Sequence, residues 1–153
     1  MNITLMAHDK KKELMVQFCT AYKSVLAKHN LSATATTGRL VAEATGLPMT
    51  LFLSHNQGGH QQVDARIDYN EIDLVLMFTD PNSIDPWEDQ QIVQTIHLCD
   101  THNVPVATNL ASAEMLVLGL DRGDLDWREI VNPRSAYNLN RKNNAVSGGK
   151  KKA

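Results

Sequence analysis

The stretch Ile72-Asp73-Leu74-Val75-Leu76-Met77-Phe78-Thr79-Asp80 decides the fold class. Residues 72–78 are nearly all apolar, and a polar loop that contains Asp80 follows them. A continuous apolar run of this length is typical of a strand that is buried on both of its faces. Such strands belong to parallel sheets, whose two faces are covered by helices.

Helical and extended patterns alternate on both sides of this central strand. Further short strands are predicted at residues 3–7, 32–36, 50–53 and 104–108, and helices at residues 11–29, 38–45, 60–69, 88–102 and 111–120. This order predicts an α/β fold, a doubly wound five-stranded parallel sheet with right-handed crossovers. We expect a single domain over residues 1–131, followed by a polar C-terminal extension over residues 132–153 whose last dozen residues are flexible.

The composition is that of an ordinary globular domain. The chain has 153 residues, 42% of them hydrophobic and 21% charged, and a formal net charge of −2, so no overall basic field attracts nucleic acid or acidic lipid. No apolar run approaches the roughly 18 residues of a membrane span, and the first residues lack the pattern of a secretory signal. Two cysteines are too few for a disulfide framework or a cysteine zinc site. We therefore expect a cytoplasmic protein without nucleic-acid or membrane partners, whose terminal lysines are solvated.

In sheets of this kind the ligand binds beyond the carboxyl ends of the strands. One such loop, which contains Thr34, Thr36, Thr37 and Gly38, opens into a helix. Hydroxyl groups and free backbone N–H groups at a helix N-terminus form an anion site, to which Lys12 can add a cation. Simple capping of the helix by threonine is the alternative explanation.

The other loops at this edge carry acid–base side chains. His8 and Asp9 follow the first strand, Ser54 and His55 the third, and Asp80, Ser83 and Trp87 the central one. Asp80 is a candidate acid–base group or simply an acceptor for loop N–H groups, and Trp87 is a candidate pocket wall or a packing residue at a helix entry. The histidine spacing does not support a metal site, and no cofactor motif is present.

His60 and Asp64 are four residues apart, so they share one face of the predicted helix. Asp64 can then orient the His60 ring, and Ser83 or Ser54 can complete a nucleophile–base–orienter set. A solvent-facing pair four residues apart is the alternative explanation for the same spacing.

Several of these segments together resemble methylglyoxal synthase, in the same order over about residues 1–131. They are His8-Asp9, Thr34-Ala35-Thr36-Thr37-Gly38, Gly58-Gly59 followed by Gln61-Gln62, Ile72-Asp73-Leu74-Val75, Asp80-Pro81 and Pro105-Val106-Ala107-Thr108-Asn109. The resemblance implies elimination of phosphate from dihydroxyacetone phosphate, a doubly wound fold and a homohexamer. It also implies phosphate binding by Lys12, Thr34, Thr36, Thr37 and Ser54, and an active site that includes His8, Asp9 and Asp80.

The departures from the family pattern lie in the same pocket. His60 stands where the resemblance places the family's catalytic aspartate, His55 stands where a glycine is expected near the phosphate, and Trp87 stands at the position of the catalytic histidine. Loss of a general base or acid typically costs about 10²–10⁴-fold in rate. We therefore expect the ancestral lyase activity to be lost or severely reduced.

Three hypotheses follow for the function. The first is a methylglyoxal-synthase scaffold with a remodelled pocket, naturally diverged or engineered, in which a Ser-His-Asp hydrolase-like site is one possibility. The second is a working synthase in which His60 is the base. The third is a module that binds a phosphorylated effector without catalysis. All three predict a small-molecule ligand and no cofactor.

Overall fold

The computed structural model describes residues 1–150, and only the backbone of residues 136, 137 and 148–150. Its five strands form one parallel sheet in the order β3-β2-β1-β4-β5. The strands are β1 (Asn2–Ala7), β2 (Asn30–Ala33), β3 (Thr50–Leu51), β4 (Leu74–Phe78) and β5 (Val106–Ala107). The predicted doubly wound, five-stranded parallel sheet is therefore confirmed.

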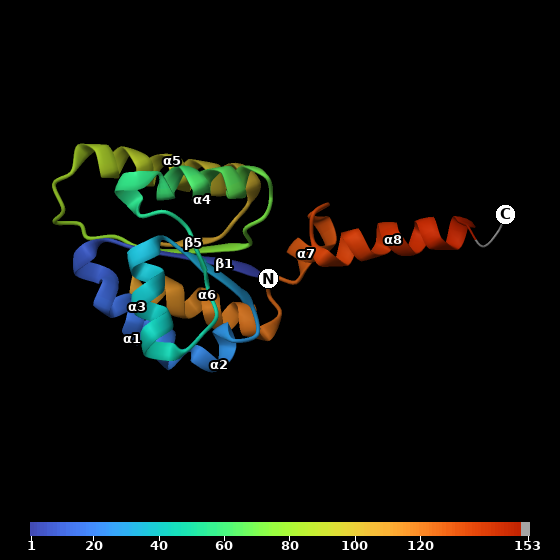
Figure 1. The fold of residues 1–153 in the computed structure, drawn as a ribbon, viewed down its shortest axis with the longest axis horizontal. Coiled ribbons are helices and arrows are strands. Elements are labelled where there is room, and N and C mark those ends of the chain that lie inside the picture. The colour runs from blue at the N-terminus through green and yellow to red at the C-terminus, as the bar shows by residue number, and fades with distance from the viewer. Residues whose placement is uncertain (151–153) are drawn as a thin grey trace.

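Helices cover both faces of the sheet (Figure 1). One face carries α4 (Gly59–Asp68) and α5 (Pro86–His102). The other carries α1 (Lys12–Ala21), the short α2 (Lys23–Leu26), α3 (Ala35–Thr45) and α6 (Leu110–Arg122). Two 3₁₀ turns, η1 (Asp9–Lys11) and η2 (His55–Gln57), connect strands to helices at the edge of the sheet.

The central strand β4 explains the two-layer core. All five of its residues are buried, and alternate residues point to opposite faces. One apolar cluster contains Leu74, Leu76 and Phe78 together with residues of α1, α3 and α6. A second cluster contains Val75 and Met77 together with residues of α4 and α5. The continuous apolar run therefore serves two cores, as its sequence predicted.

The register brings the carboxyl ends of the strands to one edge. Leu5 in β1 lies opposite Ala33 in β2 and Leu76 in β4, and the backbone N–H of Thr34 donates to the carbonyl of Leu5 over 3.4 Å. The loops that follow β1, β2 and β4 consequently meet at this edge, which positions the candidate site.

Several predicted boundaries are wrong. The helix predicted over residues 11–29 is divided into α1 and α2 and ends at Leu26, the strands predicted at residues 50–53 and 104–108 are shorter, and the clearest error is at β2. The threonine-rich pattern predicts a strand over residues 32–36, but β2 ends at Ala33 and α3 begins at Ala35. Thr34 is extended, with φ −61° and ψ 149°, and precedes the first helical turn. The local strand propensity of threonine is overridden because helix α3 starts here and packs on the sheet.

Beyond the sheet the chain continues through α7 (Trp127–Val131) to α8 (Ala136–Lys150). The guanidinium group of Arg128 is buried and holds α7 to the body through the carbonyl of Asn103 and the carboxylate of Asp73. Helix α8 extends away from the body (Figure 1). Of the last dozen residues, α8 includes those as far as Lys150, and residues 151–153 lie outside the described part of the chain. The flexibility of this end stays a prediction. Within residues 1–150 no helix combines the length and the apolar character that a membrane crossing requires.

Candidate functional site

A polar pocket of about 300 Å³ lies at the carboxyl edge of the sheet. Its walls come from the loop after β1, from η2, from the loop after β4 and from the first turn of α5. It is lined by His8, Asp9, Lys10, His55, Asp80, Asn82, Ser83, Ile84 and Glu88. The structure therefore brings together five residues that the sequence marked as candidates, namely His8, Asp9, His55, Asp80 and Ser83.

A second, much smaller cavity lies beneath this outer pocket. It has about 10 Å³ of space and is lined by Met6, Ala7, His8, Thr34, His55, His60, Met77, Glu88 and Ile92. A space of that size holds about one water molecule. His8, His55 and Glu88 line both cavities, so these three side chains separate the outer pocket from His60.

Hydrogen bonding determines the tautomer of His8. The backbone N–H of Asp80 donates to Nδ1 of His8 over 2.6 Å, so the neutral ring carries its proton on Nε2. Nε2 is buried without a hydrogen-bond partner, and Oε1 of Glu88 lies 3.4 Å from it. The Asp80 carboxylate accepts the N–H of Asn82 over 3.0 Å, which is the loop-acceptor role that the sequence left open.

The His60 ring is deeply buried on the first turn of α4, with 4% of its surface exposed. Burial, together with the charges of His55 and His8, lowers the pKa of His60 to about 4. The ring is consequently neutral at pH 7, and its Nδ1 atom is buried without a hydrogen-bond partner. An unpaired polar atom in such a place is unfavourable for stability and is typical of a site that binds something.

The orienting hydrogen bond predicted between Asp64 and the His60 ring is not formed. Asp64 instead accepts a hydrogen bond from the hydroxyl of Thr95 on α5 over 2.6 Å, and burial raises the pKa of Asp64 while this bond opposes the rise. The Ser54 hydroxyl donates to the side chain of Asn56 over 2.8 Å. Ser83 lines the outer pocket, and His60 lines only the inner cavity. The Ser-His-Asp set stays a prediction that the geometry does not favour.

The candidate anion site lies at the start of α3. The Thr34 side chain makes no capping hydrogen bond to the helix, which removes the simple capping explanation. Thr37 is 1% exposed, and its hydroxyl has no hydrogen-bond partner, whereas Thr36 is exposed. Gly38 packs tightly, since a Cβ there would collide with the Leu51 side chain. Free hydroxyl and N–H groups thus accompany the positive end of the helix dipole.

Lys12 is the candidate cation for this anion site. Its side chain is 8% exposed, and its ammonium group donates to the Ala7 carbonyl over 3.0 Å and to the Asp9 carboxylate over 2.6 Å. The hydrogen bond and the charge of Lys12 lower the pKa of Asp9. A third ammonium hydrogen remains available for a ligand, since an ammonium group has three.

The Gly58-Gly59 pair has a structural explanation. A side chain at Gly59 would collide with the carbonyl oxygen of Leu53, so only glycine permits this close turn between η2 and α4. Gln62 fixes the same turn, because its side-chain oxygen accepts the backbone N–H of Leu53 over 2.7 Å. The turn determines where His55 and His60 lie relative to the sheet.

Glu88 is a site residue that sequence reasoning missed. The sequence pattern favours Trp87, but Trp87 is 49% exposed and does not line the cavities described above, whereas Glu88 lines both. The carboxylate of Asp85 accepts the backbone N–H of Glu88 over 3.2 Å and caps α5. This Asp-Pro cap, visible in the sequence, sets the helix phase that turns Glu88 toward His8.

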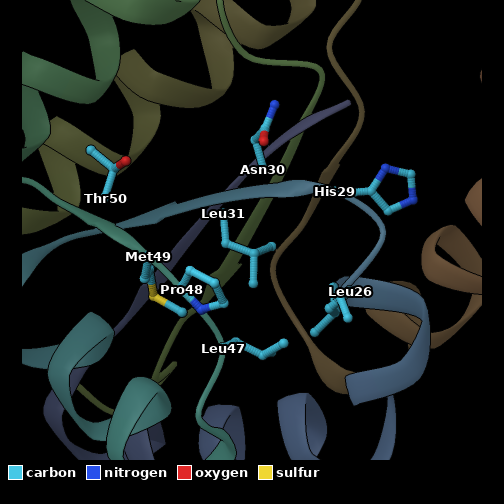
Figure 2. Close-up of a pocket in the computed structure, with 9 residues that line it drawn as sticks. Leu26, His29, Asn30, Leu31, Leu47, Pro48, Met49 and Thr50 are labelled. Atoms are coloured by element: carbon cyan, nitrogen blue, oxygen red, sulfur yellow. The ribbon is translucent and has the colours of Figure 1, made fainter.

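A larger cavity, of about 520 Å³, lies at the opposite edge of the sheet. Figure 2 shows it around the amino ends of β2 and β3, with Leu31, Leu47 and Pro48 grouped beneath the β2 strand. His29 is a titratable group in its lining, and its Nδ1 atom lies 3.1 Å from the N-terminal ammonium group. The acid–base groups gather at the carboxyl edge, which is therefore the candidate site despite its smaller volume.

No group of three or more His, Cys, Asp and Glu side chains within the described residues is arranged to hold a metal ion. His8, His55 and His60 line one cavity, but the lone pair on Nδ1 of His8 already accepts a backbone N–H. Nε2 of His8 and Nδ1 of His60 are the nitrogen atoms of these rings that are buried without a hydrogen-bond partner.

Comparison with known proteins identifies the family. The model of the MGS-like domain matches residues 14–108. Methylglyoxal synthase from Caldicellulosiruptor saccharolyticus is 56% identical over 138 residues, which cover 90% of this chain and 97% of the relative. The chain belongs to the methylglyoxal synthase family. The methylglyoxal synthase of Oceanobacillus iheyensis is 49% identical over 88% of this chain and 95% of the relative.

A solved structure extends the similarity to three dimensions. The crystal structure of methylglyoxal synthase from Elizabethkingia anophelis NUHP1 matches with a TM-score of 0.70 and 35% identity, over 76% of each chain. His55, His60 and Glu88 therefore lie on a methylglyoxal-synthase fold, at the edge of the sheet where α/β proteins bind their ligands.

Proposed function

We propose that this protein binds a small phosphorylated ligand at the carboxyl edge, and that it eliminates phosphate from dihydroxyacetone phosphate far more slowly than its relatives do. The observation that carries the proposal is the neutral, buried His60 ring beside a cavity of about 10 Å³. The resemblance assigns proton abstraction to an aspartate at this position.

The small size of the cavity beside His60 supports the loss of activity. The cavity beside His60 holds about one water molecule, which is much less than a triose phosphate requires. The side chains of His8, His55 and Glu88 stand between this cavity and the outer pocket. A ligand in the outer pocket is therefore separated from His60, and reacting atoms must approach to about 3–3.5 Å for efficient chemistry.

The charge that His60 would acquire as a base also supports the loss of activity. A carboxylate base stays ionised and becomes neutral when it takes a proton, whereas the buried His60 ring would have to become a cation. Burial opposes that cation, as the lowered pKa of about 4 indicates. The loss of an effective general base alone costs about 10²–10⁴-fold.

The opposite half of the edge supports retained phosphate binding. The Thr37 hydroxyl is buried without a hydrogen-bond partner, and Lys12 holds its ammonium group at the same edge of the sheet. An anion at the start of α3 would satisfy the threonine hydroxyl and interact favourably with the helix dipole.

A working synthase with His60 as the base is the second candidate. It is favoured by the 56% identity with a methylglyoxal synthase over 97% of that protein. It is also favoured by the neutral ring, which at pH 7 has a lone pair available to accept a proton.

An assay of methylglyoxal formation from dihydroxyacetone phosphate separates the two candidates. We expect the native chain and the His60→Asn variant to remain close to the uncatalysed rate. A rate well above background that His60→Asn abolishes would establish His60 as the base and refute our proposal.

Thermal stabilisation by inorganic phosphate tests the binding half independently of turnover. We expect millimolar phosphate to raise the melting temperature of the native chain, and Thr36→Ala to reduce that rise. The absence of any shift in the native chain would argue against phosphate binding at this edge.

The remaining expectations are also proposals. By family resemblance we expect a homohexamer in the cytoplasm. The hydrolase-like alternative predicts that a serine-directed fluorophosphonate labels the folded protein, and the absence of an adduct would remove it.

A further inference from the structure

Helix α8 carries two apolar side chains that its own chain leaves exposed. It extends away from the body (Figure 1), and Leu139 and Val146 are 48% and 61% exposed. These two residues are seven apart, so they lie on one face of the helix, with Lys142 between them on that face. Apolar residues that repeat on one face of a projecting helix are typical of a helix that packs against another surface.

Charge is distributed unequally along the chain. All 17 acidic residues precede residue 130, whereas six of the 15 basic residues follow it. The C-terminal segment is therefore purely basic and the rest of the chain is predominantly acidic. Two such segments repel each other, but each is attracted to the acidic part of another copy.

The outer face of α6 has the complementary pattern. Met115 is 71% exposed and Leu118 is 44% exposed, and they lie three residues apart on one helix face. Glu114 is also exposed on this face, and Asp121 forms an exposed ion pair with Lys28 at 3.1 Å. The apolar pair on α6, which carboxylates flank, therefore complements the apolar pair on α8, which Lys142 accompanies.

We propose that α8 of one copy packs along α6 of a second copy, with Leu139 and Val146 against Met115 and Leu118 and with Lys142 beside Glu114. We infer a second copy as the partner because α8 points away from its own body (Figure 1) and α6 carries the complementary charges. One helix–helix contact is small compared with the roughly 1,200–2,000 Å² of a stable interface. A two-fold pair repeats the contact in both directions, which doubles the buried area. A nucleic acid suits this surface less well, because the acidic body would repel a polyanion.

Cross-linking between two different variants tests the contact directly. The native Cys19 and Cys99 are buried, and burial raises the pKa of each thiol to about 12, so neither competes for a maleimide. A chain with Asn143→Cys is co-expressed with a chain carrying Met115→Cys and treated with a short bis-maleimide. We expect a covalent dimer that contains both variants. In the matched control, Asn143→Cys with Ser24→Cys on α2, the yield should be at least about tenfold lower.

Charge reversal provides the second measurement. Lys142→Glu should reduce the cross-linked yield several-fold, and Glu114→Lys in the partner variant should restore it. Equal cross-linking yields with the Met115→Cys and Ser24→Cys partners would overturn the proposal, and so would a yield that neither charge reversal changes.

Two further outcomes are distinguishable. A chain carrying both Asn143→Cys and Met115→Cys that links only within itself would show that α8 folds back on its own α6. Tight binding of a single-stranded oligonucleotide without any cross-link would identify a polyanion as the partner instead. Both of these outcomes also refute the proposal.

Discussion

The two halves of the carboxyl edge differ in how their polar groups are arranged. On the β2 side, helix α3 presents an uncapped N-terminus, and Thr37 keeps an unpaired hydroxyl in the interior. On the β4 side, His8, His55 and Glu88 close the space around a neutral His60. The first half has an unpaired hydroxyl at the positive end of a helix, and the second has a neutral imidazole at position 60 beside a cavity of about 10 Å³. Under our proposal, binding and acid–base chemistry use separate elements of this fold and can change separately.

The largest effect should come from rebuilding the β4 side. In the double variant His55→Gly/His60→Asp, we expect methylglyoxal formation from dihydroxyacetone phosphate to rise about 10²–10⁴-fold above the native chain. The glycine removes the His55 side chain that helps to separate the two cavities, and the aspartate supplies a carboxylate base. A coupled colorimetric or enzymatic assay of methylglyoxal measures the gain.

The control for this gain is His55→Gly/His60→Asn, which opens the same space without supplying a base and should stay inactive. If the aspartate variant also stays inactive while it still binds phosphate, the block lies elsewhere on the β4 side. Glu88 would then be the residue to change next, because it occupies the space beside His8.

A change on the β2 side should affect binding and stability in opposite directions. Thr37→Val removes a buried hydroxyl that has no partner in the free protein. The free protein should therefore become about 1 kcal/mol more stable, while affinity for phosphate falls about 10-fold to 100-fold. Thermal melts with and without phosphate measure both effects.

The matched control is Thr101→Val on α5, whose hydroxyl already donates to the His97 carbonyl over 2.9 Å. It should leave the stabilisation by phosphate unchanged. Equal phosphate stabilisation in the Thr37 variant and the native chain would show that the unpaired hydroxyl is not part of the anion site.

Most of the fold could be predicted from the sequence, because each strand of the sheet has a strong local signal. The apolar run of β4 implies burial on both faces, and the helices on either side of it follow from that. The start of α3 could not be predicted as well, because threonine favours strands locally and only the packing of α3 on the sheet places Thr36 in a helix.

The candidate site could be predicted as a set of loops but not as a set of contacts. Topology brought His8, His55, Asp80 and Ser83 to one pocket, as the sequence indicated. The partner of Asp64 could not be predicted, because Thr95 comes from another helix, 31 residues away. Glu88 was missed because an acidic residue in the first turn of a helix is common for electrostatic reasons alone.

The pH dependence of stability tests the neutral state of His60. An unfolded histidine has a pKa of about 6.5, and burial lowers that of His60 to about 4. Between these values the unfolded chain binds a proton that the folded chain does not, so stability should fall as the pH is lowered. From pH 7.5 to pH 5 we expect this group to contribute a loss of roughly 2 kcal/mol.

Urea unfolding at several pH values, compared between the native chain and His60→Gln, isolates this contribution. The variant should lose about 2 kcal/mol less over the same range, because glutamine does not titrate. Parallel pH profiles of the two proteins would mean that His60 is accessible and protonated in the folded state, which would weaken the contrast between the two halves of the edge.

The smallest change in stability should follow from Asp64→Asn, and it tests whether Asp64 acts on the His60 ring. Asparagine keeps an oxygen that accepts the Thr95 hydroxyl, and it removes a carboxylate that burial makes less favourable, so stability at pH 7 should change by less than about 1 kcal/mol. The exposed Asp68→Asn, on the same helix, is the matched control and should change stability even less. Because Asp64 makes no bond to Nδ1 of His60, the pH profile that His60 imposes should stay the same in Asp64→Asn. A profile that shifts to lower pH would instead mean that the Asp64 carboxylate stabilises the protonated ring, and that the orienting pair predicted from the four-residue spacing exists in solution.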